Sequence, residues 1–456
     1  MISPNYLSYK DLSARVIYKD GKYIRLILNS YKDEYNHLMN SGLFEELIKN
    51  NLLISHEEIT LNEFNKDVYK VILPKQIAFQ SYPFEWSYQQ WRKAILVFLK
   101  INQISLKYGM ILKDATPYNF YFVGGNAIMF DTSSLIFFNE NDKWIAYKQF
   151  CQEFLSPFAL MYYKGSIWSK LYMAHLRGLP LQFVSNQLPA KSWFNLSVLL
   201  HIHLHSKYSF KVSAGKATDS RGFSLSKIGS LFRMIESSIL SWEKPLFFKN
   251  YWENYYEEDI ETEEYIKSKE QVVKDWLQFI NPNSVLDLGA NTGRFSIIAS
   301  SFAEKVISLE SDESCVDEIV KQIDLKKIKN INPLIGDLAE PSPFLGLMNM
   351  ELSSLFQRAN SELILSLALI HHLYFTKDMS FAQIAELFSE FCSKYLIVEF
   401  IPIDDRKVKG LIKTKPLRES EYNIESFNLN LSLYFEKMEE ITLLPSSRVL
   451  MLFKVK

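Results

Sequence analysis

The sequence predicts an α/β protein with two dissimilar halves. From Ser284 onward, apolar segments of strand length alternate with amphipathic helical segments, a pattern typical of a doubly wound, mostly parallel sheet. The last two strand segments can pair with each other antiparallel, so the last strand is expected to run against the others. The first half begins with a hairpin and continues mainly as helices, which favours an α+β unit.

The C-terminal half contains five predicted parallel strands and a closing antiparallel pair. The strand segments are SVLDLG (284–289), KVISLE (305–310), NINPLIGD (330–337), ELILSLALI (362–370), YLIVEFIP (395–402), YFEKMEEITLL (434–444) and RVLMLFKVK (448–456). Three helices are expected between them, over 294–303, 312–327 and 380–394. A further amphipathic helix over 263–280 precedes the first strand, and we expect it to cover a ligand cleft.

The N-terminal half begins with a predicted hairpin over 13–28 that turns at Asp20-Gly21. A helix over about 33–50, a long helix over 87–109, a second hairpin turning at Gly124-Gly125 and further helices over 144–204 follow. The stretch 206–230 is polar and rich in Gly and Ser, which is typical of a linker or mobile loop. We therefore predict domains over 1–205 and 231–456, joined by a linker over 206–230.

Bulk composition narrows the class of protein. The formal net charge is −1, which argues against a nucleic-acid binder that works through bulk electrostatics. The three cysteines are far apart and form no CxxC pair, as is usual in a reducing compartment. We see no signal-peptide pattern and no apolar run long enough to cross a bilayer, so we expect a cytoplasmic protein.

The loop after the first C-terminal strand, DLGANTG, is the first place to look for a ligand. In open parallel sheets, ligands bind beyond the carboxyl ends of the strands, where the strand order reverses. Gly289 and Gly293 allow close backbone approach, but Asn291 replaces the middle glycine of the G-x-G-x-x-G pattern that cradles a pyrophosphate. Asp287 would repel a phosphate and would suit an ammonium group. The pattern therefore favours a ligand without phosphates.

Two further carboxylates follow the next two strands. Glu310 ends the second strand, where a carboxylate can accept hydrogen bonds from both hydroxyls of a ribose. Asp337 follows the third strand, where it can accept a hydrogen bond from an adenine amino group. A ligand with an amino acid, a ribose and an adenine, but no phosphate, is S-adenosylmethionine.

These motifs resemble the ordered motifs of class I S-adenosylmethionine-dependent methyltransferases. The resemblance rests on Asp287 to Gly293, then Glu310, then Gly336-Asp337, and covers about Ser241 to the C-terminus. It implies a Rossmann-like sheet and a cofactor site that includes Asn291. The segments LALIHHLYF and YLIVEFIPIDD and the final strands resemble the corresponding segments of a narrower bacterial group that includes host-specific nodulation methyltransferases.

The fourth strand ends in SLALIHHLYF, near the expected position of the sulfonium methyl. His371 or His372 is the candidate base, because an imidazole titrates near neutral pH. The alternative is a purely structural role, in which one histidine caps the strand and the other is solvated. The N/D-P-P-Y/F motif of many enzymes that methylate nucleic-acid or amide nitrogens is absent here. Its absence favours a small-molecule, glycan or natural-product acceptor, which would be methylated at oxygen or nitrogen.

The segment LKDATPYNFYFVGGNAIMFDTSS, from the first half, resembles a second family. Asp114 and Asn119 have the D-x-x-x-x-N spacing of kinase-like and aminoglycoside-phosphotransferase-like folds, and Asp131 follows after the hairpin. The resemblance implies that Asp114 orients a hydroxyl, while Asn119 and Asp131 hold the Mg²⁺ of Mg-ATP. Lys113 departs from the usual Arg or Gly, and no convincing glycine-rich loop or phosphate-binding lysine lies upstream.

Several functional hypotheses remain open at this point. The first is a methyltransferase whose kinase-like half binds the acceptor or a partner without catalysis. The second is a bifunctional kinase and methyltransferase that uses Mg-ATP. The third is a non-catalytic module that binds S-adenosylmethionine, and the kinase resemblance itself can also arise by chance. Apart from the Mg²⁺ of the second hypothesis, we assign no metal site. On a helix, histidines of HIHLH that are two residues apart would face different directions, and only the first and last would share a face.

Overall fold

The computed structural model describes residues 11–61, 66–140, 142–207, 224–244, 263–413 and 415–456. The chain forms two compact units. The first comprises Met1–Phe122, Asn126–Lys249 and Phe344–Leu352, and the second comprises Val123–Gly125, Asn250–Pro343 and Ser353–Lys456.

The first unit begins with an antiparallel sheet of strand order β1-β2-β4-β3. The turn between β1 and β2 is the predicted one, because Asp20 and Gly21 have φ of 51° and 78°, as a type I′ turn requires. Two short strand pairs, β5 with β8 and β6 with β7, follow. The strand bounds are β1 (Ala14–Lys19), β2 (Lys22–Leu28), β3 (His56–Ile59), β4 (Val68–Pro74), β5 (Met110–Leu112), β6 (Phe120–Val123), β7 (Asn126–Met129) and β8 (Leu135–Phe137).

Helices make up most of the rest of the first unit. The predicted long helix is α3, which begins with a capping box between Ser87 and Gln90. The single helix expected over 33–50 is two helices, because Gly42 has φ of 88° and interrupts it. The α-helices are α1 (Lys32–Asn40), α2 (Leu43–Lys49), α3 (Tyr88–Ser105), α4 (Tyr147–Phe150), α5 (Ser156–Lys164), α6 (Leu171–Ala174), α7 (Leu181–Gln187), α8 (Leu196–Val198) and α10 (Leu225–Ser241).

Short 3₁₀ and π segments connect these elements in the first unit. The 3₁₀ segments are η2 (Asn29–Tyr31), η3 (Pro83–Glu85), η4 (Leu106–Tyr108), η5 (Pro117–Asn119), η6 (Thr132–Ser134), η8 (Ser166–Lys170) and η9 (Ala190–Phe194). The π segments are η7 (Cys151–Leu155) and η10 (Leu199–Leu204).

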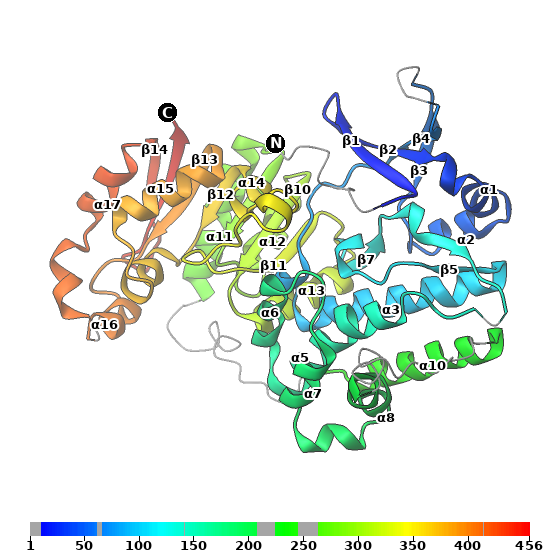
Figure 1. Cartoon of the computed structure of the whole chain (residues 1–456). Coiled ribbons are helices and arrows are strands. Elements are labelled where there is room, and N and C mark those ends of the chain that lie inside the picture. Colours follow the sequence, from blue (N-terminus) through cyan, green and yellow to red (C-terminus); the bar gives the residue numbers. More distant parts are fainter. Residues whose placement is uncertain (1–10, 62–65, 141, 208–223, 245–262, 414) are drawn as a thin grey trace. The chain divides into compact units, whose positions relative to one another are not determined.

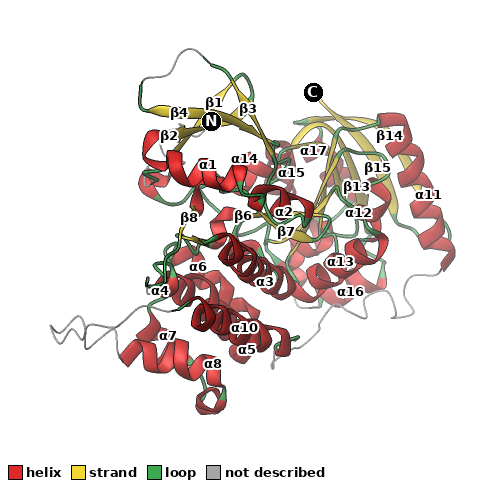
Figure 2. Cartoon of the chain, turned by 90° about the vertical axis from the view of Figure 1, so that its right-hand side faces the viewer, coloured by secondary structure: helices red, strands yellow, loops and turns green. Residues whose placement is uncertain are grey.

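The predicted boundary at residue 231 is wrong, because it lies inside α10. This helix packs against α3 in the first unit, and Figure 1 and Figure 2 both show α3, α5 and α10 side by side. Its buried side chains, which belong to the main core of the first unit, are Ile228, Phe232, Ile235 and Ile239. The structure divides the chain between Lys249 and Asn250 instead. Of the predicted linker, residues 208–223 lie outside the described residues.

The second unit contains a seven-stranded sheet of order β11-β10-β9-β12-β13-β15-β14. Strands β9 to β13 are parallel to one another, and β15 is antiparallel to both β13 and β14. The predicted doubly wound sheet with an antiparallel last strand is confirmed. The strand bounds are β9 (Ser284–Leu288), β10 (Lys305–Glu310), β11 (Ile331–Ile335), β12 (Ser361–Ser366), β13 (Cys392–Phe400), β14 (Phe435–Thr442) and β15 (Val449–Val455).

Helices cover this sheet, and α11 lies just before the first strand. Helices α12 and α13 pack near β9 to β11, whereas α15 packs on β12 and β13. The helices and short segments are α11 (Glu263–Ile280), α12 (Arg294–Ala299), α13 (Glu313–Lys326), α14 (Leu355–Ala359), η12 (His372–Thr376), α15 (Phe381–Phe391), α16 (Arg406–Ile412), η13 (Pro416–Glu421) and α17 (Ile424–Leu431); η11 (Leu347–Asn349) groups with the first unit. None of the helices in the described parts of the chain has the length and apolar content needed to cross a bilayer.

Candidate functional site

A cavity of about 180 Å³ lies at the carboxyl ends of the parallel strands. The strand order reverses here, because β10 and β11 lie on one side of β9 and β12 lies on the other. Six of the eight residues predicted for the C-terminal site line this cavity, namely Asp287, Gly289, Asn291, Glu310, Asp337 and His372. Gly293 and His371 are not among its lining residues.

The glycine loop after β9 has a backbone that favours glycine at two positions. Gly289 and Gly293 have φ of 68° and 82°. A Cβ at Gly293 would lie 2.8 Å from Cγ1 of Ile319, and one at Gly289 would lie 3.0 Å from Cδ1 of Leu369. Gly293 therefore serves packing behind the cavity, which explains why it does not line it.

The backbone amides of this loop, from Gly289 to Gly293, all donate hydrogen bonds within the protein. The amides of Gly289 and Ala290 donate to Leu309 O at 2.9 and 3.1 Å, and the amide of Asn291 donates to Glu310 Oε2 at 2.9 Å. The amide of Thr292 donates to Asn291 Oδ1 at 2.7 Å, and the amide of Gly293 donates to Ala290 O at 2.9 Å. A phosphate-binding loop needs free amides that point at the ligand. This loop is therefore poorly suited to a pyrophosphate.

Asp287 is the deepest carboxylate of the cavity, with only 2% of its surface exposed. Its Oδ2 accepts a hydrogen bond of 2.6 Å from Ser296 Oγ, which in turn accepts one of 2.7 Å from Ser308 Oγ. Burial raises the pKa of Asp287 to about 6, and the nearby Glu310 adds to the rise, although Ser296 opposes it. A cation placed in the cavity would favour the ionised form.

Glu310 and Asp337 are held at the ends of β10 and β11. Glu310 Oε1 accepts hydrogen bonds from the amides of Ser311 and Asp312 at 2.6 and 2.9 Å. Asp337 Oδ1 accepts one from the amide of Ala339 at 2.9 Å, and its Oδ2 pairs with Lys377, which also lines the cavity. A ligand amino group would compete with Lys377 for this carboxylate.

Lys269 is a lining residue that the sequence analysis missed. Its Nζ lies 2.6 Å from Glu399 Oε2 and 4.9 Å from the ring centroid of Phe295. Glu399 is fully buried and also accepts a hydrogen bond from Tyr265. Helix spacing indicates that Lys269 is buried, because it stands four residues after Tyr265 and four before Val273 on the buried stripe of α11, but it does not indicate the partner Glu399.

The buried network continues away from the cavity through Arg448. Its Nη1 donates to Tyr265 Oη at 3.0 Å, and its Nε donates to Asp405 Oδ2 at 2.9 Å. The network therefore ties α11 to the start of α16 and to the end of the sheet. Such buried pairs hold elements in one arrangement only while both partners are present.

The two candidate histidines have different surroundings. His372 lines the cavity, and burial, with a smaller effect of Lys407, lowers its pKa to about 4. His371 is fully buried, and neither ring nitrogen has a hydrogen-bond partner among the described residues. Burial, then His372 and Arg448, lowers the pKa of His371 well below its usual value. His372 is therefore the histidine that a ligand can reach.

The predicted kinase-like residues come together in the first unit. Asn119 Nδ2 donates to Asp131 Oδ2 at 3.3 Å, and Ser133 Oγ donates to Asp131 Oδ1 at 2.7 Å. Arg25, from β2, forms an ion pair with Asp131. Burial by itself would raise the pKa of Asp131, but Arg25 and Ser133 outweigh it and hold the pKa below its usual value. A guanidinium thus already neutralises the carboxylate expected to bind Mg²⁺.

Asp114 lies close to this cluster. Burial, reinforced by Asp131, raises the pKa of Asp114 to about 6. Its neighbour Lys113 belongs to the same cluster, since its Nζ pairs with Asp11 at 3.2 Å and donates to Ser13 Oγ at 2.7 Å, and its charge opposes the rise in the pKa of Asp114. The carboxyl expected to orient a hydroxyl therefore has a raised pKa, while the carboxylate expected to hold the metal pairs with an arginine.

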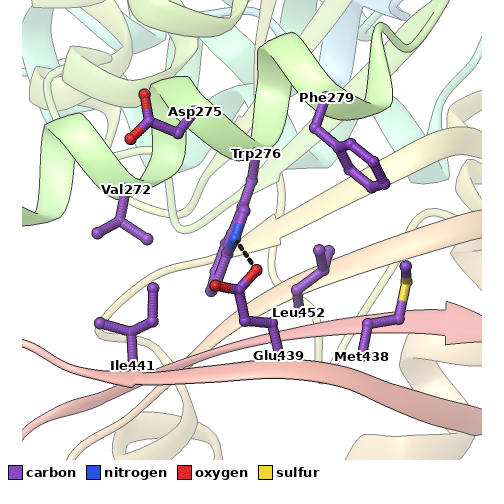
Figure 3. A pocket seen from close by; sticks show the side chains of 8 residues that line it. All are labelled: Val272, Asp275, Trp276, Phe279, Met438, Glu439, Ile441 and Leu452. Atoms are coloured by element: carbon purple, nitrogen blue, oxygen red, sulfur yellow. Dashed lines mark hydrogen bonds between the residues drawn. The ribbon is translucent and has the colours of Figure 1, made fainter.

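A second hollow of about 360 Å³ lies between α11 and strands β14 and β15. Figure 3 shows Trp276 on its helix side, with the indole nitrogen directed at Glu439, to which it donates at 2.8 Å. Asp275, the other carboxylate of its lining, accepts a hydrogen bond from Gln271 at 2.8 Å. The hollow contains neither the glycine loop nor the strand-end carboxylates, so the cavity at Asp287 is the better candidate.

Comparison with known proteins gave one curated relative and many solved structures. No family model matches the sequence. Nodulation protein NoeA from Rhizobium meliloti (strain 1021) is 28% identical over 436 residues, which cover 93% of this chain and 90% of NoeA. The similarity to NoeA therefore extends over both units.

The solved structures match a smaller part of the chain. The N-methyltransferase NodS from Bradyrhizobium japonicum WM9 is 10% identical with a TM-score of 0.31, covering 42% of this chain and 96% of NodS. Magnesium protoporphyrin IX methyltransferase from Synechocystis PCC 6803, solved with bound SAH, is 17% identical with a TM-score of 0.32, covering 48% of this chain and 95% of that one. Each therefore corresponds to less than half of this chain.

Proposed function

We propose that the second unit is an S-adenosylmethionine-dependent methyltransferase that acts on an oxygen or nitrogen atom of a small-molecule, glycan or natural-product acceptor. One observation carries the proposal. Three carboxylates from three successive strands line one cavity, while every amide of the adjacent glycine loop is engaged within the protein. Such a donor set fits a ligand with an ammonium group, a ribose and an adenine better than it fits a dinucleotide.

Each part of this cofactor would meet a different residue of the cavity. Asp287 would accept the ammonium group, Glu310 the ribose hydroxyls and Asp337 the adenine amino group. Gly289 and Asn291 would form the wall beside the amino acid, where Gly289 has a positive φ and a Cβ on it would lie 3.0 Å from Leu369 Cδ1. Apolar lining residues would contact the adenine and thioether, among them Leu309, Leu338, Leu367 and Leu373.

The chemistry asked of the protein is mainly positioning. The cofactor, when bound, supplies a methyl group on a positively charged sulfur. His372 would lie beside the acceptor atom and accept its proton, since its low pKa keeps the imidazole neutral at physiological pH.

Two features support a glycan or small-molecule acceptor. The net charge of −1 gives no bulk attraction to nucleic acid, and no N/D-P-P-Y/F motif follows β12. We also propose a cytoplasmic location.

Isothermal titration with S-adenosylhomocysteine tests the cofactor assignment. We expect binding by the wild type and a loss of at least about tenfold in Asp287→Ala, because a charge-assisted hydrogen bond is worth about 1.5–3 kcal/mol. Asp337→Asn keeps an acceptor oxygen and should bind more tightly than Asp337→Ala. Wild-type protein that binds NADH but not S-adenosylhomocysteine would contradict the proposal.

For the first unit we propose a kinase-derived scaffold that binds the acceptor or a partner and transfers no phosphate. The ion pair between Arg25 and Asp131 supports this proposal over the bifunctional kinase, because it occupies the carboxylate that Mg-ATP would need. Titration of the full chain with Mg-ATP should show no binding. Binding that is lost in Asp131→Ala would restore the bifunctional alternative.

A further inference from the structure

The first unit exposes a group of large apolar side chains on neighbouring helical segments. We call it the apolar face, and its members are Phe183, Trp193, Phe194, Leu196, Leu200 and Leu204. Phe194 is 93% exposed and Leu196 is 57% exposed. Leu196, Leu200 and Leu204 recur every four residues, so they share one side of α8 and η10. Helix α7 and segment η9 both contact this region, and α7 and α8 lie near each other in Figure 1 and Figure 2.

A buried histidine holds these segments together. His203 is fully buried, its Nδ1 lies 2.8 Å from Ser185 Oγ of α7, and its Nε2 lies 2.8 Å from Ser192 Oγ of η9. Its ring also stacks on Trp193 with centroids 4.1 Å apart and planes 3° apart. The exposed side chains therefore project from a well-connected frame. These contacts also account for the central histidine of the HIHLH motif.

The stretch of chain that contains the apolar face carries charge of one sign. No Asp or Glu occurs between Glu153 and Asp219, although 52 of the 456 residues of the chain are acidic. Five basic residues in the described part of this stretch are exposed, namely Lys164, Lys170, Arg177, Lys191 and Lys207. Lys207 Nζ lies 4.8 Å from the ring centroid of Trp193, at the apolar face itself. A complementary partner is therefore both apolar and anionic.

We infer that the apolar face binds the surface of a bilayer that contains anionic lipids. Contiguous exposed apolar side chains mark interaction sites in soluble proteins. Trp and Phe are suited to the headgroup level, and lysines nearby gain energy from an anionic leaflet. No helix in the described residues crosses a membrane, so the contact lies in the plane of the interface. The inference does not depend on the methyltransferase proposal.

Vesicle flotation tests the inference with the full chain. We expect the wild type to float with vesicles of phosphatidylcholine and phosphatidylglycerol in equal amounts, and to remain behind with phosphatidylcholine alone. The double variant Phe194→Ser, Leu196→Ser should lower the partition coefficient at least about tenfold, because it removes apolar area that the interface would bury. Lys191→Gln should lower it by about fivefold, as one lysine near an anionic surface contributes about 1 kcal/mol.

A matched double variant in the second unit, Phe279→Ser with Leu429→Ser, removes apolar side chains of similar exposure and should float like the wild type. Wild-type protein that floats with neither vesicle overturns the inference, as does equal loss in both double variants. Sedimentation velocity distinguishes a protein interface. A dimer of the wild type that the Phe194→Ser, Leu196→Ser variant abolishes would assign the face to self-association and overturn the inference.

Discussion

Acidification should weaken cofactor binding through Asp287. Burial raises the pKa of this carboxyl to about 6, and the proposed ammonium partner needs the ionised form. With that pKa, about one molecule in eleven is ionised at pH 5 and about ten in eleven at pH 7. We therefore expect the affinity for S-adenosylhomocysteine to rise roughly tenfold between these pH values and then to level off, a change of about 1.4 kcal/mol.

Isothermal titration from about pH 5 to pH 8 measures this dependence. Asp287→Asn keeps the size of the side chain and removes the titration, so its affinity should be low and almost independent of pH. A wild-type affinity that does not change with pH, or a variant with the same slope, would refute the role of Asp287. The wild-type slope would then belong to another group.

The same pKa has a consequence for stability that runs in the opposite direction. An acid whose pKa is raised in the folded state prefers to be protonated there. Its contribution to the unfolding free energy is fully present below its ordinary pKa of 3.8 and is lost as the pH rises through about 6. Bound cofactor should offset this loss, because it favours the ionised carboxylate.

Three further predictions concern single side chains. Glu399→Ala should lower the unfolding free energy by about 3–5 kcal/mol in urea titrations, since it leaves the ammonium of Lys269 buried without its partner. The double variant Glu399→Leu with Lys269→Met removes both charges and should recover most of the loss. Gly293→Ala should cost about 2–5 kcal/mol in the same assay, because a positive φ and a 2.8 Å contact add together, and a loss below 1 kcal/mol would contradict the packing described. His372→Ala should lower kcat at least about 10²-fold with little change in cofactor affinity. His371→Leu should change the unfolding free energy by less than about 1.5 kcal/mol, because the ring of His371 has no hydrogen bond to lose among the described residues. Equal effects of the two variants on kcat would contradict the assignment of His372 as the base.

The sequence was sufficient for the sheet of the second unit and for the residues at its edge. Asp287, Glu310 and Asp337 each follow a run of apolar residues, and parallel strands necessarily bring such positions to one edge. The glycine loop was also predictable, because Gly289 and Gly293 frame a turn that other residues would strain. Local patterns therefore determined most of the cavity at the carboxyl ends of the strands.

Features that depend on distant partners were not predictable. Lys269 lies 130 positions from Glu399 in the sequence, and no local pattern indicates that the two meet in the core. Arg25 likewise reaches Asp131 from a strand 106 positions away. The predicted domain boundary at residue 231 was wrong because α10 follows a polar, Ser-rich stretch. The apolar stripe of α10 packs on α3, which lies much earlier in the chain. Tertiary packing, not composition, assigns such segments.

Methyl transfer from S-adenosylmethionine carrying a labelled methyl group tests the central claim most directly. The purified full chain is incubated with fractionated extract of its own cells, and wild type is compared with Asp287→Ala. We predict label in one acceptor fraction, of glycan or small-molecule character, with the wild type only. Cofactor binding without label in any fraction would contradict the methyltransferase proposal and would favour a module that only binds the cofactor, and equal label with both proteins would contradict the site.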